Sequence, residues 1–328
     1  MPQEFYNDLL FRRREQLNQR LASTAQVVFG DHFLVRRALD CMVPGRKVRS
    51  ILFVELLKAL NPKASPTVVD NVVFAIEGVH AASVLVDDVV DRDSFRHGTS
   101  AVSHTWGDST SVLFAHLLAG SAISNLNALP LLQQRLLDVY RQMSLGEMYD
   151  LMIPPGSWRH SGYDCRTSQK THALFAFSVG SAVVLAGATQ GVESFDDLGK
   201  RIGLLYQIGN DYHDWQPKNL LKRHSPSDVW PITFSFPLAV YLQKYGSHEI
   251  QPFLKRRHLP HSDWQILLRQ IWRPEVKAAC REALRKCLSD VLATIKTNIE
   301  NPKVRGLYAA IARSTVREQF WYQPYQVR

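Results

Sequence analysis

Residues 72–91 read VVFAIEGVHAASVLVDDVVD, an apolar segment with helical periodicity that ends in three aspartates. Asp87 and Asp91 are four positions apart and Asp88 and Asp91 are three apart, so a helix places their carboxylates on one face. Each close pair repels by about 1 kcal/mol in water and by about 4 kcal/mol at an effective dielectric constant of 20. A divalent cation removes this repulsion, and oxygen ligands that share their metal with substrate phosphates suit Mg²⁺. The stretch therefore predicts a central helix with a magnesium site at its end.

A second acidic cluster occurs in RIGLLYQIGNDYHDW, residues 201–215. Asp211 and Asp214 are three positions apart, and Asn210 supplies a further carbonyl oxygen. A single cluster of this kind is compatible with a solvated helix end. Two clusters, each after an apolar helix, favour a site in which both sets of oxygens hold Mg²⁺ ions around one diphosphate.

Basic side chains accompany the two clusters. The segment GRKVR at 45–49 stands at a predicted helix start, where backbone N–H groups also favour anions. Each basic residue taken singly has an ordinary structural explanation, but together they predict a site for two anionic groups, one held through metal and one held directly. The candidate residues are Arg46, Arg49, His80, Arg96 and Lys170.

The composition is that of one globular protein with a positive charge. The chain has 328 residues, 45% of them hydrophobic, and 39 Lys and Arg against 30 Asp and Glu give a net charge of +9. This excess favours an anionic partner. Helical periodicity runs through nearly the whole chain, and long alternating apolar and polar runs are absent, which predicts an all-α protein without a sheet. No composition break marks a linker, so a single domain over 1–328 is expected.

Four segments are apolar enough to be central helices: 72–90, 110–124, 173–188 and 198–210. None of the apolar stretches reaches the length that spans a bilayer. The four cysteines form no CxxC pair, so a zinc site is not expected. We expect the cysteines to be free thiols in a reducing cytoplasm.

Five stretches together resemble the trans-polyprenyl diphosphate synthase family. They match, in the family's order, its GGKxxRP segment, its first Asp-rich motif with the trailing RRG, and its GQxxDL, KTxxLF and FQxxDDxxD segments. The stretches are PGRKVRS (44–50), IEGVHAASVLVDDVVDRDSFRHG (76–98), SLGEMYDL (144–151), QKTHALF (169–175) and GLLYQIGNDYHDW (203–215).

The resemblance implies an isoprenoid synthase helical bundle around a deep central cavity, and a homodimer. It implies a Mg²⁺-dependent reaction that joins an allylic prenyl diphosphate to isopentenyl diphosphate. By motif position, the ligands of Mg²⁺ on the allylic diphosphate are Asp87 and Asp91, supported by Asp88. The ligands of the remaining Mg²⁺ are Asn210, Asp211 and Asp214.

The same resemblance assigns the diphosphate-binding side chains. Arg96 and Lys170 would clamp the allylic diphosphate, and Gln207 would orient the second half of the site. The residues that would bind isopentenyl diphosphate are Arg46, Arg49 and His80. Lys170 thus joins the three aspartates of the first motif among the expected catalytic residues.

Small residues before the first motif predict a long product. In the family, a bulky residue four or five positions before the first Asp stops the growing chain. Those positions are Ser83 and Ala82 here, which leaves room for a product of C20 or longer. An aromatic residue of another helix would be the alternative floor, and the candidates are Phe74, Phe114 and Phe177.

Several positions depart from the family motifs. Asn210 replaces a metal-binding Asp, His97 replaces the second Arg of RRG, and Glu147 replaces the Gln of GQ. Thr233 stands where a diphosphate-binding Lys is expected, and Arg46 conservatively replaces a Lys.

These departures leave three hypotheses open. The first is an elongating synthase, favoured by the retained diphosphate-binding cations. The second is a class I terpene synthase, or a prenyltransferase to a non-isoprenoid acceptor, favoured by the changes at His97 and Thr233. The third is a non-catalytic subunit of another synthase, which the intact DDVVD disfavours.

Two dense basic runs raise the question of nucleic acid or membrane binding. They are residues 12–14 and 255–257, and neither lies in a known nucleic-acid-binding pattern. No nucleic-acid partner is therefore expected. Peripheral contact with an anionic membrane, where a long apolar product would be delivered, is the alternative use of these runs.

Overall fold

The computed structural model describes residues 3–96, 99–158, 163, 168–188, 191–216, 229–231, 234–256 and 258–317. These residues are helical nearly throughout, which confirms the all-α prediction. In chain order, the elements before residue 153 are α1 (Gln3–Phe29), α2 (His32–Met42), α3 (Val48–Leu60), α4 (Pro66–Asp91), β1 (Phe95–Arg96), β2 (Thr99–Ser100), α5 (Val102–Trp106), α6 (Asp108–Ser124) and α7 (Pro130–Met152).

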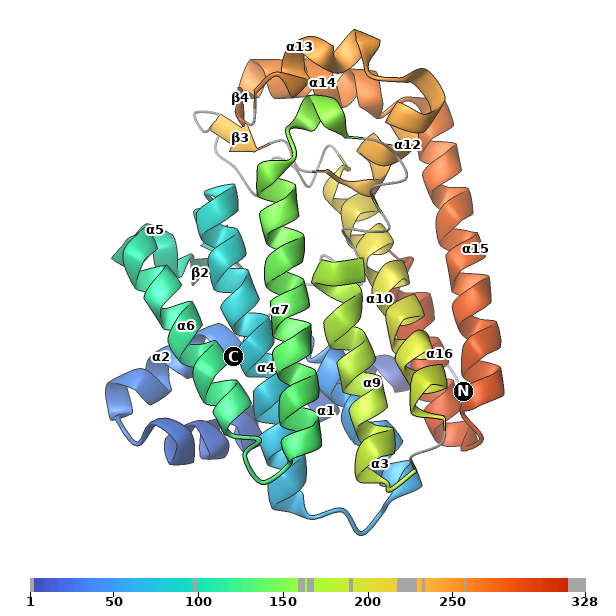
Figure 1. The fold of residues 1–328 in the computed structure, drawn as a ribbon. Coiled ribbons are helices and arrows are strands. Elements are labelled where there is room, and N and C mark those ends of the chain that lie inside the picture. Colours follow the sequence, from blue (N-terminus) through green and yellow to red (C-terminus); the bar gives the residue numbers. More distant parts are fainter. Residues whose placement is uncertain are drawn as a thin grey trace.

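The later elements complete the bundle. They are the 3₁₀ turn η1 (Pro155–Ser157), the π turn η2 (Ser168–His172), α9 (Ala173–Leu185), α10 (Val192–Asp214), β3 (Val229–Pro231), α12 (Phe236–Tyr245), the 3₁₀ turn η3 (His248–Ile250), α13 (Gln251–Leu254), β4 (His258–Pro260), α14 (His261–Ile271), α15 (Pro274–Asn298) and α16 (Pro302–Thr315). The long helices run side by side along one axis, and α13 and α14 lie across one end of them (Figure 1).

Helix starts follow the sequence signals. α4, α7, α15 and α16 each begin with a proline, whose missing N–H costs nothing in the first turn. Asp31 caps α2 by accepting a hydrogen bond from the backbone N–H of Leu34 at 2.9 Å. Asn301 caps α16 in the same way through Lys303 and Val304. These caps fix where each helix enters the bundle.

The core is built around α4 and α9, whose side chains are buried on most sides. Gly199 of α10 lets that helix approach α9, since a Cβ there would lie 2.6 Å from the backbone of Ala176. Gly78 does the same for α4 and α6, because its Cβ would lie 2.8 Å from that of Ala122. Buried apolar side chains form one cluster from Leu17 to Ala312, but the single domain over 1–328 stays a prediction.

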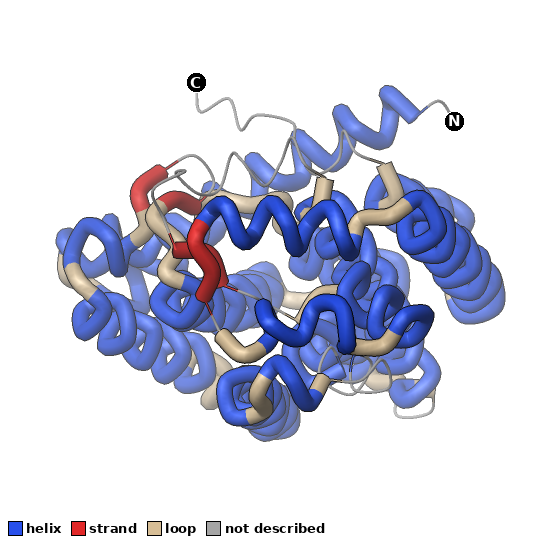
Figure 2. Tube along the Cα trace, turned by 90° about the horizontal axis from the view of Figure 1, so that it is seen from above, coloured by secondary structure: helices blue, strands red, loops and turns tan. Residues whose placement is uncertain are grey.

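Three expectations need adjustment. α6 is not central: it buries one face, and Leu113 on the other is 70% exposed. Two short antiparallel ribbons, β1–β2 and β3–β4, occur where no strand was expected (Figure 2). By length and composition α4 could cross a membrane, but 67% of its apolar window is buried, as in a core helix.

The bundle brings the expected motifs to one end. α4, α7 and α10 all finish there, and η2 leads into α9 from the same end (Figure 1). The acidic C-terminal turns of α4 and α10 and the basic residue of η2 therefore meet around the same space. This placement comes from three long helices that run in one direction and a shorter helix, α9, that runs in the other.

Candidate active site

The first acidic cluster lies at the end of α4 in a half-buried setting. Burial raises the pKa of Asp87, and it raises the pKa of Asp91 to about 6 with help from the charge of Asp93. A raised pKa means that the charged form of a carboxyl group is destabilised. A bound cation stabilises that charged form. Asp87 and Asp91 thus have the charge and setting of metal ligands.

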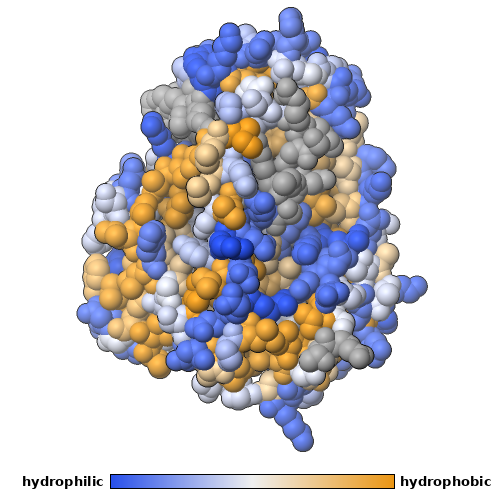
Figure 3. Space-filling model, in the orientation of Figure 1, coloured by the Kyte–Doolittle hydropathy of each residue, from blue (hydrophilic) through white to orange (hydrophobic). Residues whose placement is uncertain are grey.

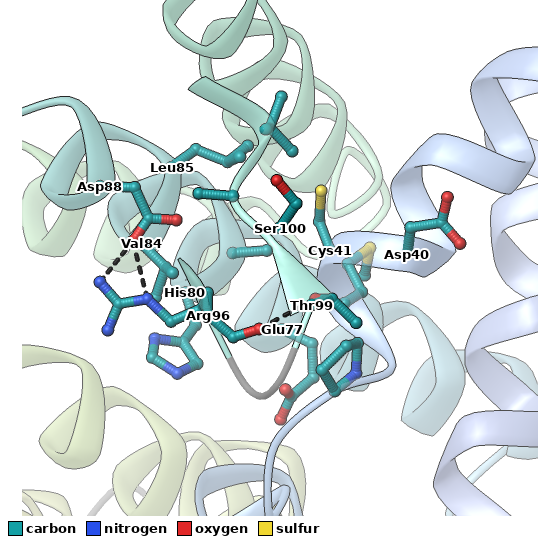
Figure 4. A pocket seen from close by; sticks show the side chains of 15 residues that line it. Asp40, Cys41, Glu77, His80, Val84, Leu85, Asp88, Arg96, Thr99 and Ser100 are labelled. Carbon is teal, nitrogen blue, oxygen red and sulfur yellow. Dashed lines mark hydrogen bonds and ion pairs between the residues drawn. The ribbon is translucent and has the colours of Figure 1, made fainter. Parts of the chain in front are cut away.

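Asp88 has a different environment from its neighbours. It is 2% exposed and accepts a hydrogen bond from Arg96 Nε at 2.7 Å, and Arg96 Nη2 also contacts Asp93 at 2.8 Å. Figure 4 shows Arg96 folded back onto Asp88. These two carboxylates raise the pKa of Arg96, although burial alone would lower it. Asp88 therefore positions Arg96 beside the first acidic cluster, and its supporting role at a metal site stays a prediction.

Lys170 of η2 pairs with two carboxylates of α7. Its ammonium forms ion pairs with Glu147 and, at 3.1 Å, with Asp150, both on α7. Burial would lower the pKa of Lys170, but the carboxylates of Asp87, Glu147 and Asp150 raise it. Burial and the charge of Asp87 raise the pKa of Glu147 to about 7. One ammonium is thus shared by several carboxylates in the region predicted to clamp the allylic diphosphate.

The second cluster is already engaged within the protein. Both oxygens of Asp211 accept hydrogen bonds: Oδ2 from Tyr163 Oη and from the backbone N–H of Phe236, each at 2.8 Å, and Oδ1 from Gln207 Nε2 at 2.7 Å. Burial raises the pKa of Asp211 to about 6 against these bonds. Asp211 ties α10 to α12 and to Tyr163, and its role as a metal ligand stays a prediction. Asn210 and Asp214 are half-buried on the same turn.

Gln207 is fixed from two sides. Its amide donates to Asp211, and its carbonyl oxygen accepts a hydrogen bond from Thr171 Oγ1 at 2.8 Å. Thr171 follows Lys170 in η2. Gln207 therefore couples the second cluster to the turn that carries the clamp residue, which suits its expected orienting role.

The candidate acceptor site lies where α3 meets α4. Arg49 Nη1 is 3.3 Å from His80 Nε2, and the guanidinium donates to that ring nitrogen in the tautomer that leaves it unprotonated. The Arg49 guanidinium also lies 4.4 Å from the ring centroid of Phe175 and 5.8 Å from that of Tyr206. Arg46 is half-buried in the loop before α3. The structure thus brings Arg49 and His80 together as the resemblance implies.

A buried ion pair that sequence reasoning missed supports this loop. Lys47 adopts a left-handed backbone (φ 57°) and is 4% exposed; its ammonium donates to the carbonyl of Pro44 at 2.9 Å and lies 3.4 Å from Glu77 Oε2. Ser50 Oγ donates to Glu77 Oε1 at 2.5 Å. The signal was present in the sequence, because a glutamate inside an apolar helix needs a partner.

A pocket lies along the face of α4 that carries Glu77 and His80 (Figure 4). Its walls come from the end of α2, from α4 and from the β1–β2 ribbon, and they include Cys41, Glu77, His80, Asp88 and Arg96. The half-buried thiol of Cys41 has a pKa that burial raises to about 12, so it is a weak nucleophile. His80 and Arg96 thus connect the acceptor site to a pocket of mixed polarity.

Some expected positions fall outside the described residues: His97, Thr233 and Cys165. Among the described cysteines, Cys41, Cys280 and Cys287 are free thiols, as expected. Within the described ranges, no three acidic, histidine or cysteine side chains already converge on one metal-sized point. Mg²⁺ commonly takes one or two carboxylates and fills its shell with substrate phosphates and water, so Asp87 and Asp91 fit such an ion. The second cluster also offers oxygen donors, since the two oxygens of Asp211 accept three hydrogen bonds and keep a lone pair for a cation.

Known proteins resemble the chain in both sequence and fold. The model of the polyprenyl synthetase family matches residues 33–269. Over 250 residues the chain is 28% identical to geranylgeranyl pyrophosphate synthase 2 of Zymoseptoria tritici, covering 73% of the chain and 71% of the relative. It is 27% identical over 176 residues to octaprenyl diphosphate synthase of Haemophilus influenzae, covering 52% of the chain and 53% of that protein. The match thus spans only about half of that protein's length.

The structural likeness extends over nearly the whole chain. The crystal structure of a polyprenyl synthase from Caulobacter crescentus, complexed with calcium and isoprenyl diphosphate, matches with a TM-score of 0.81 and 20% identity, covering 97% of this chain and 98% of that one. At this identity the match establishes the isoprenoid synthase fold. The match of the family model over residues 33–269 shows that the chain belongs to the polyprenyl synthetase family.

Proposed function

We propose that the protein is a Mg²⁺-dependent prenyltransferase that condenses an allylic prenyl diphosphate with isopentenyl diphosphate to an all-trans product of C20 or longer. The observation that carries the proposal is the pairing of two unlike sites along α4. Asp87 and Asp91 form an acidic site beside Lys170, and His80, two turns earlier, meets Arg49 of α3. A reaction between two diphosphates requires one metal-binding site and one cationic site.

The chain's own residues account for binding and for ionisation of the allylic substrate. Asp87 and Asp91 would hold the metal, which supplies charge stabilisation for the departing diphosphate. Lys170 and Arg96 lie beside them and add cationic charge at the same oxygens. Arg49 and His80 would hold the second diphosphate. The rings of Phe175 and Tyr206 next to Arg49 help to exclude water, which would otherwise capture the allylic cation.

The second candidate is a class I terpene synthase, or a prenyltransferase with a non-isoprenoid acceptor, on the same scaffold. It is favoured by the uncharged Asn210, which leaves the second cluster with one negative charge fewer than the family motif has. Such an enzyme would ionise the allylic diphosphate at the first cluster and would not need isopentenyl diphosphate. A non-catalytic partner subunit is disfavoured because the first cluster keeps its carboxylates and its lysine.

A product assay separates these functions. Purified protein with Mg²⁺ would receive dimethylallyl, geranyl, farnesyl or geranylgeranyl diphosphate, each with and without isopentenyl diphosphate. Longer diphosphates that form only with isopentenyl diphosphate support elongation. Hydrocarbons or alcohols without it support the terpene synthase. Arg49→Ala should abolish elongation but leave a pure cyclisation largely intact, with Asp91→Asn as the variant that stops both.

Product length rests on the small residues before the first motif. Ser83 is half-buried, and its hydroxyl donates to the carbonyl of His80 at 2.8 Å, whereas Ala82 is 1% exposed. Ser83→Phe should therefore shorten the product. Ala82→Phe would overpack the interior and should mainly lower stability. An unchanged product distribution in a folded Ser83→Phe variant would place the floor at another residue.

Assembly and location are part of the proposal. We propose a homodimer, supported by exposed apolar side chains on α6 and α7 such as Leu113 and Met148. Cytoplasmic location and peripheral contact with an anionic membrane stay predictions from the cysteines and the basic runs.

A further inference from the structure

The loop between α2 and α3, residues 43–47, carries Arg46 of the candidate acceptor site and has an unusual backbone. Gly45 has φ 105° and Lys47 has φ 57°, both in the left-handed region. A lysine in this conformation is strained, and it persists only where the surrounding structure holds it in place. Strained residues of this kind concentrate at ligand-binding sites, and this one lies beside an arginine that is a candidate for binding diphosphate.

The side chain of Lys47 turns back into its own loop and is buried. Its ammonium donates to the carbonyl of Met42, the last residue of α2, and at 2.9 Å to the carbonyl of Pro44. The same ammonium lies 3.4 Å from Oε2 of Glu77 on α4. The loop is therefore wrapped around one buried cation, and α2, α3 and α4 meet at that cation.

Glu77 holds the chain on both sides of Arg49. It pairs with Lys47, two residues before Arg49, and its Oε1 accepts a hydrogen bond at 2.5 Å from Oγ of Ser50, one residue after it. Glu77 also lies three residues before His80, so both project from the same face of α4. Glu77 thus fixes how the first turn of α3 lies against α4, where Arg49 meets His80.

We infer that Lys47 and Glu77 are positioning residues of the acceptor site: their buried pair shapes the loop so that Arg46 and Arg49 converge on the acceptor diphosphate. Neither residue of the pair would touch that diphosphate, because both side chains are engaged within the protein and are only 1% and 5% exposed. Arg46 and Arg49 flank Lys47 in the chain and are half-buried. The inference rests on the proposed function, because it requires an acceptor that carries a diphosphate.

Isothermal titration calorimetry with isopentenyl diphosphate measures the acceptor site without turnover. EDTA is present, so that metal-dependent binding at the first acidic cluster does not contribute. Glu77→Gln should weaken binding at least about tenfold, because the loop no longer directs both arginines at one diphosphate. Asp70→Asn is the matched control: it breaks another ion pair of α4, the one with Arg20 of α1, and should change the affinity less than about twofold.

A double variant separates positioning from stability. Lys47→Met combined with Glu77→Gln leaves no unpaired charge in the interior, so its urea midpoint should lie closer to that of the unmodified protein than the midpoint of Glu77→Gln does. Its affinity for isopentenyl diphosphate should nevertheless stay at least about tenfold reduced. An affinity equal to that of the unmodified protein would show that the pair only stabilises the fold, and would overturn the inference.

Steady-state kinetics of elongation give a second measurement. Glu77→Gln should raise the KM for isopentenyl diphosphate at least about tenfold and the KM for the allylic substrate less than about twofold. Equal rises in both KM values would indicate a general distortion of the site and overturn the inference.

The calorimetry also separates failure of the inference from failure of the proposed function. An unmodified protein that binds no isopentenyl diphosphate contradicts the proposed function and the inference together. Binding by the unmodified protein that Glu77→Gln and the double variant leave unchanged overturns the inference alone.

Discussion

At the scale of single residues, burial sets the behaviour of the acidic groups. Asp91 and Asp211 have pKa values near 6 and Glu147 near 7, all raised first by burial. In the unfolded chain these groups titrate near 4. The folded protein therefore holds their protons more tightly than the unfolded chain does, and below about pH 6 a cation would have to replace those protons.

This difference predicts a pH-dependent stability of the metal-free protein. Groups whose folded pKa is raised stabilise the fold below the unfolded pKa, near pH 4, and this stability is lost as the pH rises through 6 to 7. His172, whose pKa burial lowers to about 4, acts in the opposite direction, but it is one group against three. The melting temperature in EDTA should fall between pH 5 and pH 7.5.

Thermal melts followed by circular dichroism measure this effect. Glu147→Gln removes one of the titrating groups and should make the fall shallower, and Mg²⁺ with pyrophosphate should restore stability at pH 7.5 by mass action. A melting temperature that rises with pH across this range would contradict the assignment of buried, protonated carboxyl groups.

Tyr163 offers a second test at this scale. Its hydroxyl donates to the buried Asp211, and hydrogen bonds to charged groups are worth about 1.5–3 kcal/mol. Tyr163→Phe should lower the free energy of unfolding by about 2 kcal/mol in urea titrations. Tyr149→Phe is the matched control, because that side chain is 47% exposed. Equal effects of the two changes would show that the Tyr163 bond contributes little.

At the scale of elements, the buried pair of Lys47 and Glu77 fixes how the loop before α3 meets α4. The loop bends through the left-handed backbone of Lys47, and its ammonium holds the preceding carbonyls in place. Arg46 and Arg49 flank Lys47 in the chain. The position of the candidate acceptor site thus depends on a contact that does not itself touch substrate.

Breaking this pair should be costly. Glu77→Ala leaves the ammonium of Lys47 buried without its counter-ion, and such changes cost about 3–5 kcal/mol. Glu15→Ala, which removes a half-exposed partner of Arg14, should cost no more than about 1 kcal/mol. Urea denaturation compares the two variants. A loss of less than about 1 kcal/mol for Glu77→Ala would mean that water reaches Lys47.

Elements also mark the limit of sequence reasoning. The apolar run before Asp87 and the spacing of the aspartates predicted α4 and its acidic end, because both depend on local periodicity. α6 was expected in the centre because its composition is apolar on all sides. Composition alone does not show whether the outer face of a helix is covered by other helices of the same chain or is left exposed. The contact between Glu147 and Lys170 joins two distant segments, so no spacing indicates it.

At the scale of the whole molecule, one face is more apolar than a monomer needs. Apolar surface extends over the side of α6 (Figure 3). On α7, Leu145, Met148 and Met152 follow helical spacing and are 39%, 52% and 71% exposed. Single exposed apolar side chains are ordinary, whereas a continuous patch indicates a partner. We predict that a second copy of this chain covers this surface, because a two-fold axis pairs a patch with itself.

The dimer prediction can be tested by placing charge in this patch. Light scattering during size exclusion should give twice 37.3 kDa for the unmodified protein and 37.3 kDa for a variant with Leu113→Glu and Met148→Glu. Both side chains are exposed within one copy, at 70% and 52%, so the variant should keep its fold and lose only the contact between copies. Leu60→Glu is the matched control: Leu60 is 44% exposed at the end of α3, outside the patch on α6 and α7, and this variant should remain dimeric. An unmodified protein that runs at 37.3 kDa would instead leave the apolar patch to a partner of another kind, and a charged variant that stays dimeric would place the contact between copies on another face.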